Sequence, residues 1–561
     1  MKRLFLHTFL LFILTVFTAP LTTHAQSVLP NRALDNSFLQ HDGVMRYYRV
    51  ALPVTYTCLQ QSFGNDKNAV RDFWREAEDF LNQVYIPIGI CMQVIQDDRL
   101  MMTKTNVVDS SPYNATGWGT DLINEIVGEK AYDIGLWLSE PADWDNSGVS
   151  ILGGAYGTGT KAGGYSQPNI ITVAHEMGHL FGAVHTHDEG AMTEPGLGQS
   201  VMGYGNPSDF LSLASMKAIF DMNKEKNAAY YSDEARTKLV GNNAGGNYVY
   251  GIKPGNNKAP QIDVTKMSER YRVPQGGCFA LPIFATDTDG DRITYVFQQY
   301  EDGASFHAYG PSASSVIDFH PQYTMFPYDD YLFIDDGTDL PQMPAGTYNF
   351  IAAVNDLPTS SQMNYDALVA NPFCPKYSIF KTQIEIVAGT PFSATLSPNK
   401  THYSAGESVQ VKWGINSSLF DSNTRVRITM SDNFGKTYDH ILAEGIPAKN
   451  GSCEVVLPHL SFGELNQTFG KGNRNVRPGI IRIEIEGGIA YTLTCTSPEN
   501  SGAAGGFTMS GGTPTSIQRP HITTTDAIYD LNGRLIKQGA TQISDLPTGI
   551  YIHKGQKIYR K

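Results

Sequence analysis

The stretch AHEMGHLFGAVH, from Ala174 to His185, constrains the fold of this chain more than any other feature of its sequence. On a helix, His175 and His179 lie about one turn apart and project from the same face. Gly182 then allows the backbone to leave the helix through a turn that residues with a Cβ disfavour. The turn brings His185 back toward the same face, so the stretch predicts three imidazoles that converge on one point.

Three neutral imidazoles are a ligand set typical of a catalytic zinc site, because a fourth position stays open for water. Glu176 lies beside the first ligand, where its carboxylate can act as general base toward a zinc-activated water and later return the proton. A core helix that happens to carry histidines is the competing interpretation, and the match at every fixed position of HExxHxxGxxH disfavours it. We therefore expect one catalytic Zn²⁺ on His175, His179 and His185.

A second motif follows at 200–204, where the chain reads SVMGY. Together with HExxHxxGxxH it resembles the metzincins, zinc endopeptidases that have a methionine-containing turn beneath the metal. The resemblance implies that Met202 forms an apolar floor under the three histidines. Some metzincin branches carry a tyrosine two residues after this methionine, and there it approaches the metal or the transition-state oxyanion. The resemblance thus assigns Tyr204 a catalytic role.

The resemblance covers residues 45–225. The segments YDIGLWL, GVSILGGAYGTGTKAGG and EPGLGQSVMGYG are similar to blocks of reprolysin-like metzincins from Bacteroidetes. It implies an endopeptidase acting on extracellular proteins, with the glycine-rich segment at the cleft, where an edge strand can pair with an extended substrate. His187 is a rival metal ligand, but the motif spacing favours His185. We expect His187 and Asp188 to lie around the site or at the surface.

Periodicity divides the chain into an α/β part and a β-rich part. Strands expected near 45–57, 88–95 and 132–138 alternate with helices near 68–84 and 210–223, which predicts a mainly parallel sheet. Beyond about residue 245, short β-rich runs alternate with turn residues, which is typical of β-sandwiches. The expected order is a signal peptide at 1–25, a short pro-segment or linker at 26–44, a metzincin-like domain at 45–240, a cadherin-like or similar sandwich at 251–388, an immunoglobulin- or fibronectin-like sandwich at 389–498, a flexible linker at 499–522 and a small β unit at 523–561.

Both ends of the chain indicate export. Lys2-Arg3, an apolar run and a small-residue ending at Ala25 are typical of a secretory signal, and the run is too short to span a membrane. The final unit, with a hairpin signal at Asn532-Gly533 and a KIYRK ending, resembles the sorting domain of the Bacteroidetes type IX secretion system. A small β module on the preceding sandwich is the alternative. We expect a protein that is secreted or attached to the outer-membrane surface, with type IX machinery and protein substrates as partners and no transmembrane segment in the mature chain.

Cysteine usage and charge agree with that expectation. The six cysteines fall two to a region, and an oxidising compartment favours pairing within each region. The expected disulfides are Cys58–Cys91, Cys278–Cys374 and Cys453–Cys495. The net charge of -13 argues against a nucleic-acid partner, because phosphate contacts need clustered Lys and Arg.

Three alternatives stay open. The sequence from Asp287 through Asp289 to Asp291 resembles the start of a calcium loop, although the EF-hand pattern fails further on; a strand–turn–strand is expected, with Ca²⁺ as the alternative. Latency through Asp35 or Asp42, displacing the active-site water, competes with an ordinary linker. Finally, a surface adhesin with a vestigial metal site competes with the peptidase, and the intact Glu176 speaks against it.

Overall fold

The computed structural model describes much of the chain from residue 38 onward. The described ranges are 38–140, 147–187, 193–194, 197–204, 209–226, 231–232, 238–239, 249–255, 257–300, 308–312, 316–319, 325–328, 331–334, 344–400, 402–432, 437–459, 476–494, 507–510, 527–529, 535–538, 549–553 and 556–560. The signal peptide, Asp35, Asp188, Cys495 and the Asn532-Gly533 turn lie outside these ranges. Within them, no helix has the length and apolar character needed to cross a bilayer.

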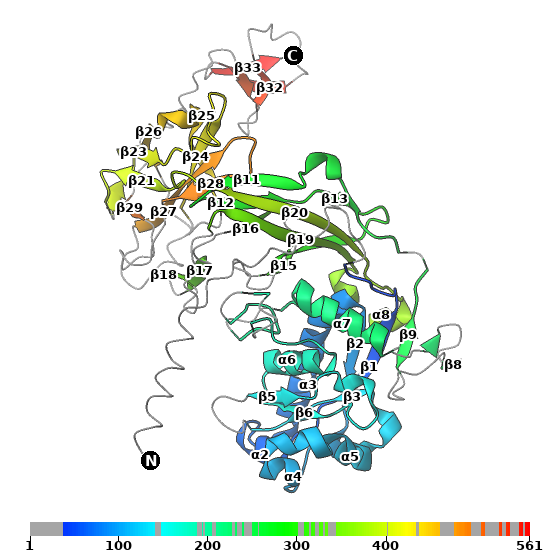
Figure 1. The fold of residues 1–561 in the computed structure, drawn as a ribbon. Helices are drawn as coiled ribbons and strands as arrows, with labels where there is room; N and C mark the ends of the chain where they lie inside the picture. The colour runs from blue at the N-terminus through cyan, green and yellow to red at the C-terminus, as the bar shows by residue number, and fades with distance from the viewer. Residues whose placement is uncertain are drawn as a thin grey trace, which may run out of the picture.

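The amino-terminal domain is a mixed α/β structure, as predicted (Figure 1). Strand β1 (Met45–Ala51) pairs in parallel with β2 (Ile90–Val94) and β3 (Ile134–Gly135). Helix α3 (Lys67–Tyr85) is preceded by Asp66, whose side chain accepts the backbone N–H of Asn68 and so caps the helix. The remaining helices before the histidine motif are α2 (Tyr56–Gln61), α4 (Val107–Ser110) and α5 (Ala115–Val127).

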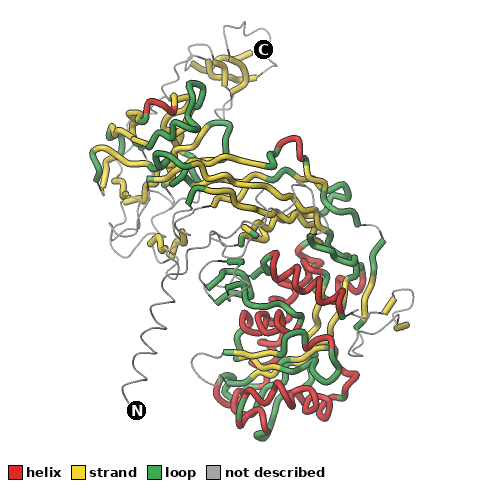
Figure 2. The backbone as a smooth tube through the Cα atoms, in the orientation of Figure 1, coloured by secondary structure: helices red, strands yellow, loops and turns green. Residues whose placement is uncertain are grey.

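A second, smaller sheet leads into the histidine helix (Figure 2). Its strand order is β4 (Trp137–Leu138), β6 (Gly164–Ser166) and β5 (Gly148–Ser150), which leaves β5 at the edge. Helix α6 (Ile170–Leu180) follows β6 and is capped by the Asn169 side chain, which accepts two backbone N–H groups. Helix α7 (Leu213–Glu225) closes the domain, close to its predicted range.

Strand β1 is buried on both faces, because apolar residues pack against each face. Tyr48 and Val50 face the main core, where Trp74 of α3 also lies. On the opposite face, Tyr47 lies in a separate cluster with Leu368 of helix α8 (Tyr365–Ala370). The Tyr47 hydroxyl donates to the Leu368 carbonyl at 2.7 Å. A segment far along the chain therefore covers the outer face of this sheet.

That segment connects two strands of a five-stranded sheet in the β-rich part. Its order is β11 (Arg270–Pro274), β20 (Tyr377–Val387), β19 (Gly346–Leu357), β14 (Arg292–Gln299) and β15 (Tyr309–Ser312). Ile351 and Ile379 of this sheet join the same hydrophobic cluster as Phe220 of α7. The sheet thus packs against the amino-terminal domain, as Figure 1 shows.

An eight-stranded sheet joins the two ranges predicted as separate sandwiches. Strand β12 (Cys278–Pro282) pairs with β28 (Ala490–Leu493), which comes from the second predicted range. Pairing across the two ranges was not evident from the local pattern, since sequence alternation does not report which strands become neighbours. The other strands of this part include β16 (Val316–Phe319), β24 (Arg425–Ser431), β25 (His440–Pro447), β27 (Val476–Ile485), and a small sheet of β21 (Ala394–Ser397), β23 (Ser408–Trp413) and β26 (Ser452–Val456).

The predicted flexible linker at 499–522 contains a strand, which corrects that part of the prediction. Strand β29 (Phe507–Ser510) pairs with β22 (His402–Ser404) and with β27. Phe507 and Met509 alternate along it and are buried in a hydrophobic cluster, and this burial outweighs the glycine-rich surroundings. Beyond it, the small β unit forms one sheet of β31 (Leu535–Gln538), β30 (Ala527–Tyr529), β32 (Gly549–His553) and β33 (Gln556–Arg560).

Two of the three predicted disulfides are wrong in this structure. Cys58 lies in the main core, whereas Cys91 lies in the cluster on the other face of the sheet; both are thiols. Consecutive strand residues point to opposite faces, so Cys91 is directed away from the core that its neighbours on β2 enter. The third pairing, Cys453–Cys495, involves a residue outside the described ranges.

The Cys278–Cys374 pairing fails for a different reason. Cys278 follows β11, whose Pro274 lies opposite Val387 at one end of β20, while Cys374 precedes the other end of the same strand. The 11 residues of β20 span about 35 Å, far more than the roughly 7 Å between Cα atoms that a disulfide permits. Strand length therefore separates two cysteines that sequence position alone had paired.

We expect non-reducing peptide mapping to show neither the Cys58–Cys91 nor the Cys278–Cys374 cross-link. The purified full-length protein would be denatured with a thiol-blocking reagent present, digested without reductant and analysed by mass spectrometry. A reduced digest of the same sample serves as control. Recovery of either cross-linked peptide pair would contradict this arrangement of the strands.

Candidate active site

Helix α6 presents His175 and His179 on one face, and backbone carbonyls fix both rings. The Nδ1 atom of His175 lies 2.7 Å from the Val201 carbonyl oxygen. The Nδ1 atom of His179 lies 2.8 Å from the Ala183 carbonyl oxygen. A carbonyl only accepts, so each neutral ring carries its proton on Nδ1 and directs an Nε2 lone pair away from that contact.

The predicted glycine turn is present after the helix. Gly182 has a φ of 97°, and its N–H donates to the His179 carbonyl at 2.9 Å. This left-handed turn returns the chain so that His185 Nε2 lies 3.0 Å from His179 Nε2. The three histidines offer ligand atoms that all lie within 4.8 Å of one another. The structure thus brings the three predicted ligands together.

This arrangement fits a metal ion. Burial, with the adjacent His179 ring contributing, lowers the pKa of His175 to about 3, so this imidazole stays neutral and keeps a lone pair to donate. Ligands about 2.0–2.1 Å from a tetrahedral zinc would lie about 3.3 Å apart, close to the separation of the His179 and His185 nitrogens. The residues present therefore suit Zn²⁺ held by three imidazoles.

Glu176 is buried beside the imidazoles. Its side chain is only 3% exposed, and its Oε2 has no hydrogen-bond partner. Burial raises the pKa of Glu176 to about 8. A nearby cation would favour the charged form of this carboxylate, and such an orphaned oxygen is what a proton acceptor at a reaction centre requires.

The edge strand β5 runs directly past this carboxylate. A Cβ at Gly148 would lie 2.5 Å from Glu176 Oε1, so only glycine allows the strand to approach so closely. Among the described residues, strand β5 pairs only with β6 and is the last strand of its sheet. Its other side offers backbone hydrogen-bonding groups next to Glu176.

Met202 packs beneath helix α6. It is fully buried, and a Cβ at Gly178 would lie 2.3 Å from its sulfur. A residue larger than glycine at position 178, on the helix between the two histidines, would force the methionine side chain to move. The Val201 carbonyl, one residue earlier, is the group that holds the His175 ring. The turn around Met202 thus supports the histidines both by packing and by hydrogen bonding.

Tyr204 lies at the open side of the three histidines. Its hydroxyl is 2.8 Å from His185 Nε2, and its ring centroid is 4.6 Å from that of His185. The side chain is 54% exposed, so it is accessible from solvent. His187 stacks on His185 with ring centroids 5.2 Å apart, and it is not a member of the converging group. The structure therefore places the rival ligand beside the site.

The sequence analysis missed Glu194, which holds the loop between His185 and Met202. This fully buried carboxylate accepts from the Thr186 hydroxyl at 2.8 Å and the Ser200 hydroxyl at 2.5 Å. It also accepts the backbone N–H of Ala308, which belongs to the β-rich part. A single acidic residue in a short loop carries no periodic signal, so only the fold reveals its partners.

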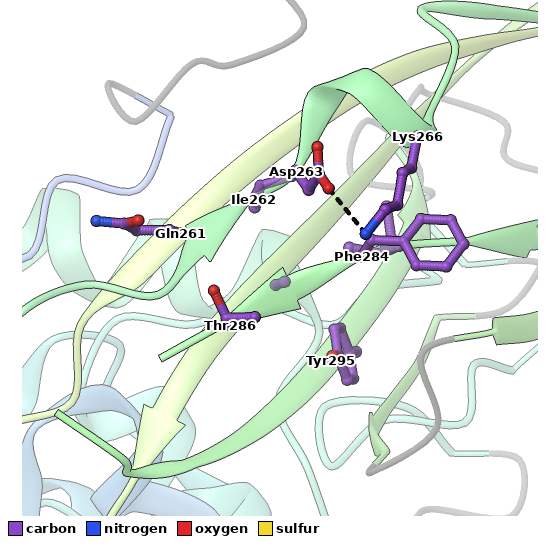
Figure 3. Close-up of a pocket in the computed structure, with 9 residues that line it drawn as sticks. Gln261, Ile262, Asp263, Lys266, Phe284, Thr286 and Tyr295 are labelled. Atoms are coloured by element: carbon purple, nitrogen blue, oxygen red, sulfur yellow. Dashed lines mark ion pairs between the residues drawn. The ribbon is translucent and has the colours of Figure 1, made fainter. Parts of the chain in front are cut away.

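Two other features lie apart from this chemistry. Asp42, one of the two residues considered for latency, forms an ion pair with Arg46 at 2.5 Å. Burial raises the pKa of the Asp42 carboxyl, whereas the contact with Arg46 lowers it. A hollow of about 450 Å³ on the β-rich part contains the ion pair of Asp263 and Lys266, with Phe284 and Tyr295 in its wall (Figure 3). Its lining has no histidine or cysteine, so it does not resemble the histidine site.

Several solved structures show a weak likeness to this chain. A chaperone–substrate complex matches at 16% identity over 32% of this chain and 35% of that chain, with a TM-score of 0.24. Fibronectin(III)-like modules of Clostridium thermocellum CbhA match at 10% identity over 47% of this chain and 99% of theirs, with a TM-score of 0.15. The four amino-terminal Ig domains of Dscam1 isoform 6.9 match at 10% identity over 47% and 50%, with a TM-score of 0.13. The chain thus spans about a third of the first of these structures. TM-scores this low do not establish a shared fold with any of the three.

No curated protein matches the chain. A family model does match: residues 46–220 fit Reprolysin_5, described as Metallo-peptidase family M12. The matched range contains the three converging histidines, Glu176, Met202 and Tyr204. The amino-terminal domain is therefore similar in sequence to M12 metallopeptidases, which supports a metallopeptidase acting on protein substrates.

Proposed function

We propose that this protein is a secreted zinc endopeptidase of the metzincin type. The observation that carries the proposal is the convergence of three imidazoles, of which His175 is kept neutral by burial, next to a buried carboxylate whose Oε2 has no hydrogen-bond partner. A metal site that had lost its function would not require fixed ring tautomers or a buried acid. The match of this domain to M12 metallopeptidases supports the same reaction class.

His175, His179 and His185 would hold the ion. Zn²⁺ in such a site polarises a peptide carbonyl and lowers the pKa of water. Glu176 accepts a proton from the water that attacks the carbonyl carbon, and then delivers it to the amine nitrogen as the C–N bond breaks. Burial of the carboxylate excludes bulk water, so the proton stays within the site.

An extended peptide would bind along strand β5. The free edge of this strand runs past Glu176, and main-chain pairing with a substrate would place the scissile bond near the carboxylate. Because such pairing uses backbone groups, it accepts many sequences. This favours protein substrates in extended or unfolded segments.

The hydroxyl of Tyr204 would donate to the oxyanion that develops on the attacked carbonyl. Its contact with His185 directs it toward the point where the imidazoles converge, and its exposure leaves room for substrate. In the absence of substrate the same hydroxyl is held by the imidazole.

Export to the cell exterior is also part of the proposal. It rests on the signal-like residues 1–25 and on the resemblance of the final unit to a type IX sorting domain. Attachment to the outer-membrane surface and release are both compatible with such a unit. Fractionation of the producing cells, with detection of both ends of the chain, would test this part.

The first test of catalysis is Glu176→Gln. Glutamine keeps the size of the side chain but cannot accept the proton, so kcat for casein or gelatin should fall by roughly 10²–10⁴-fold. Zinc, measured by elemental analysis, should remain near one ion per chain, because Glu176 is not among the three ligands. Glu76→Gln, at an exposed position on α3, is the matched control. If the Glu176 variant cleaves as fast as the unaltered protein, the mechanism is wrong, and target binding by an adhesin becomes the question.

The second test is Tyr204→Phe. Loss of the hydroxyl should lower kcat by roughly tenfold to a hundredfold while KM and zinc content change little, because the donor acts mainly in the transition state. Tyr113→Phe, at another exposed tyrosine, controls for loss of a surface hydroxyl. A fall in zinc content with kcat per bound zinc unchanged would show that Tyr204 supports the ligands instead.

A further inference from the structure

A second cluster of potential ligands lies in the β-rich part, on the turn between β13 (Ala285–Thr286) and β14. Asp287, Asp289 and Asp291 have carboxylate oxygens within 4.8 Å of one another. The turn folds around Asp287, whose Oδ1 accepts the backbone N–H of Asp289 at 2.8 Å and of Asp291 at 3.1 Å. Its other oxygen, Oδ2, is buried and has no hydrogen-bond partner.

A fourth carboxylate, on the adjacent strand β19, lies close enough to this turn to interact with the charges of Asp287 and Asp291. Asp356 lies at the end of β19, opposite Ile293 of β14, and is fully buried. Its Oδ1 accepts the Lys376 backbone N–H at 2.6 Å, while Oδ2 has no partner. The pKa of Asp356 is raised to about 7, mainly by burial and to a smaller extent by the charges of Asp287 and Asp291, while the Lys376 backbone N–H and the Asn257 side chain lower it.

Asn257 lies on a third segment of the chain near this cluster, in addition to the turn and strand β19. Its side chain is 9% exposed and donates from Nδ2 to the Cys374 carbonyl at 2.8 Å, but its Oδ1 has no partner. Three oxygen atoms, on Asp287, Asp356 and Asn257, are therefore buried and unsatisfied in one neighbourhood. Orphaned buried acceptors are uncommon because each costs about 1–3 kcal/mol, and their coincidence indicates a missing partner.

Two ammonium groups nearby do not satisfy these oxygens. Lys258 pairs with Asp289 at 2.9 Å, on the outer side of the turn. The Lys376 ammonium donates to the Asn257 backbone carbonyl. Both contacts leave the Asp287 and Asp356 Oδ2 atoms unpaired.

We propose that this cluster binds one Ca²⁺ ion. The ligand atoms are all oxygens and come from an irregular turn and two neighbouring segments, which suits the flexible six- to eight-fold coordination of Ca²⁺ better than the strict octahedron of Mg²⁺. Zinc sites in proteins usually include nitrogen or sulfur ligands, and the cluster is made of carboxylates alone. Asp287, Asp289 and Asp291 bind from the turn, and Asp356 and Asn257 close the site directly or through water.

The ion would tie together segments that cover the catalytic domain. Asn257 lies just after strand β9 (Tyr250–Ile252), which pairs with β1 of the peptidase sheet. Its hydrogen bond to Cys374 reaches the cluster that covers the outer face of that sheet. Calcium would therefore stabilise the junction of the two parts, independently of zinc.

The test uses the full secreted chain, freed of loosely bound cations on a chelating resin, with zinc content checked before and after. Calcium binding would be measured by equilibrium dialysis with radioactive Ca²⁺, and thermal unfolding would be followed with and without 2 mM Ca²⁺, a concentration of about the extracellular range. Variants Asp287→Asn and Asp356→Asn remove ligand charge, and Asp263→Asn, at an acid paired with Lys266 in the same part, is the matched control.

We expect both site variants to bind one Ca²⁺ fewer per chain, or to bind it at least about tenfold more weakly, and to lose the Ca²⁺-dependent rise in Tm. The control should match the unaltered protein. In calcium-free buffer, Asp356→Asn should unfold at the same or a higher temperature, because it removes an unpaired buried acid. Unchanged calcium binding in both site variants, no binding by the unaltered protein at millimolar Ca²⁺, or equal protection by Mg²⁺ would overturn the proposal.

Discussion

Strand β1 carries apolar residues on both faces, and the need to cover both faces determines how the chain is arranged. Helix α3 and its neighbours cover one side. The other side is covered by residues from the β-rich part, with Leu368 and Cys374 in one cluster with Tyr47. A half-covered sheet would expose a row of aromatic and aliphatic side chains to water, at about 25 cal/mol for each Å². The β-rich part is therefore a structural component of the catalytic domain.

The same dependence extends to the active site. Hydrogen bonds to Glu194 hold the loop that carries the methionine turn. One of the groups that donate to this carboxylate is the backbone N–H of Ala308, in the β-rich part. On the same side, Gln298 of β14 donates to the Thr193 carbonyl. Because Val201 in this loop fixes the His175 ring, packing between the two parts contributes to the orientation of a metal ligand. The proposed calcium site lies at the other end of β14, before its first residue.

Burial shifts the pKa values of two groups in the active site in opposite directions. It keeps His175 neutral, which preserves a lone pair for a cation, and it raises the pKa of Glu176, which makes this carboxylate a better proton acceptor. Neither effect needs a long-range charge. Both arise because helix α6 is enclosed between the small sheet, α3 and the methionine turn, so closely that a Cβ at Gly148 would overlap the Glu176 side chain and one at Gly178 the Met202 side chain.

The local chemistry could be predicted from the amino-acid sequence: the helix with two histidines one turn apart, the glycine that returns His185, and the α/β character of the first domain. These follow from periodicity and from the φ values open to glycine, which act over a few residues. The long-range contacts could not be predicted: which cysteines are neighbours, that Phe507 and Met509 form a strand, and that Glu194 and Leu368 serve the catalytic domain. Those contacts join residues far apart in the chain, and side-chain burial selects them without leaving a local pattern.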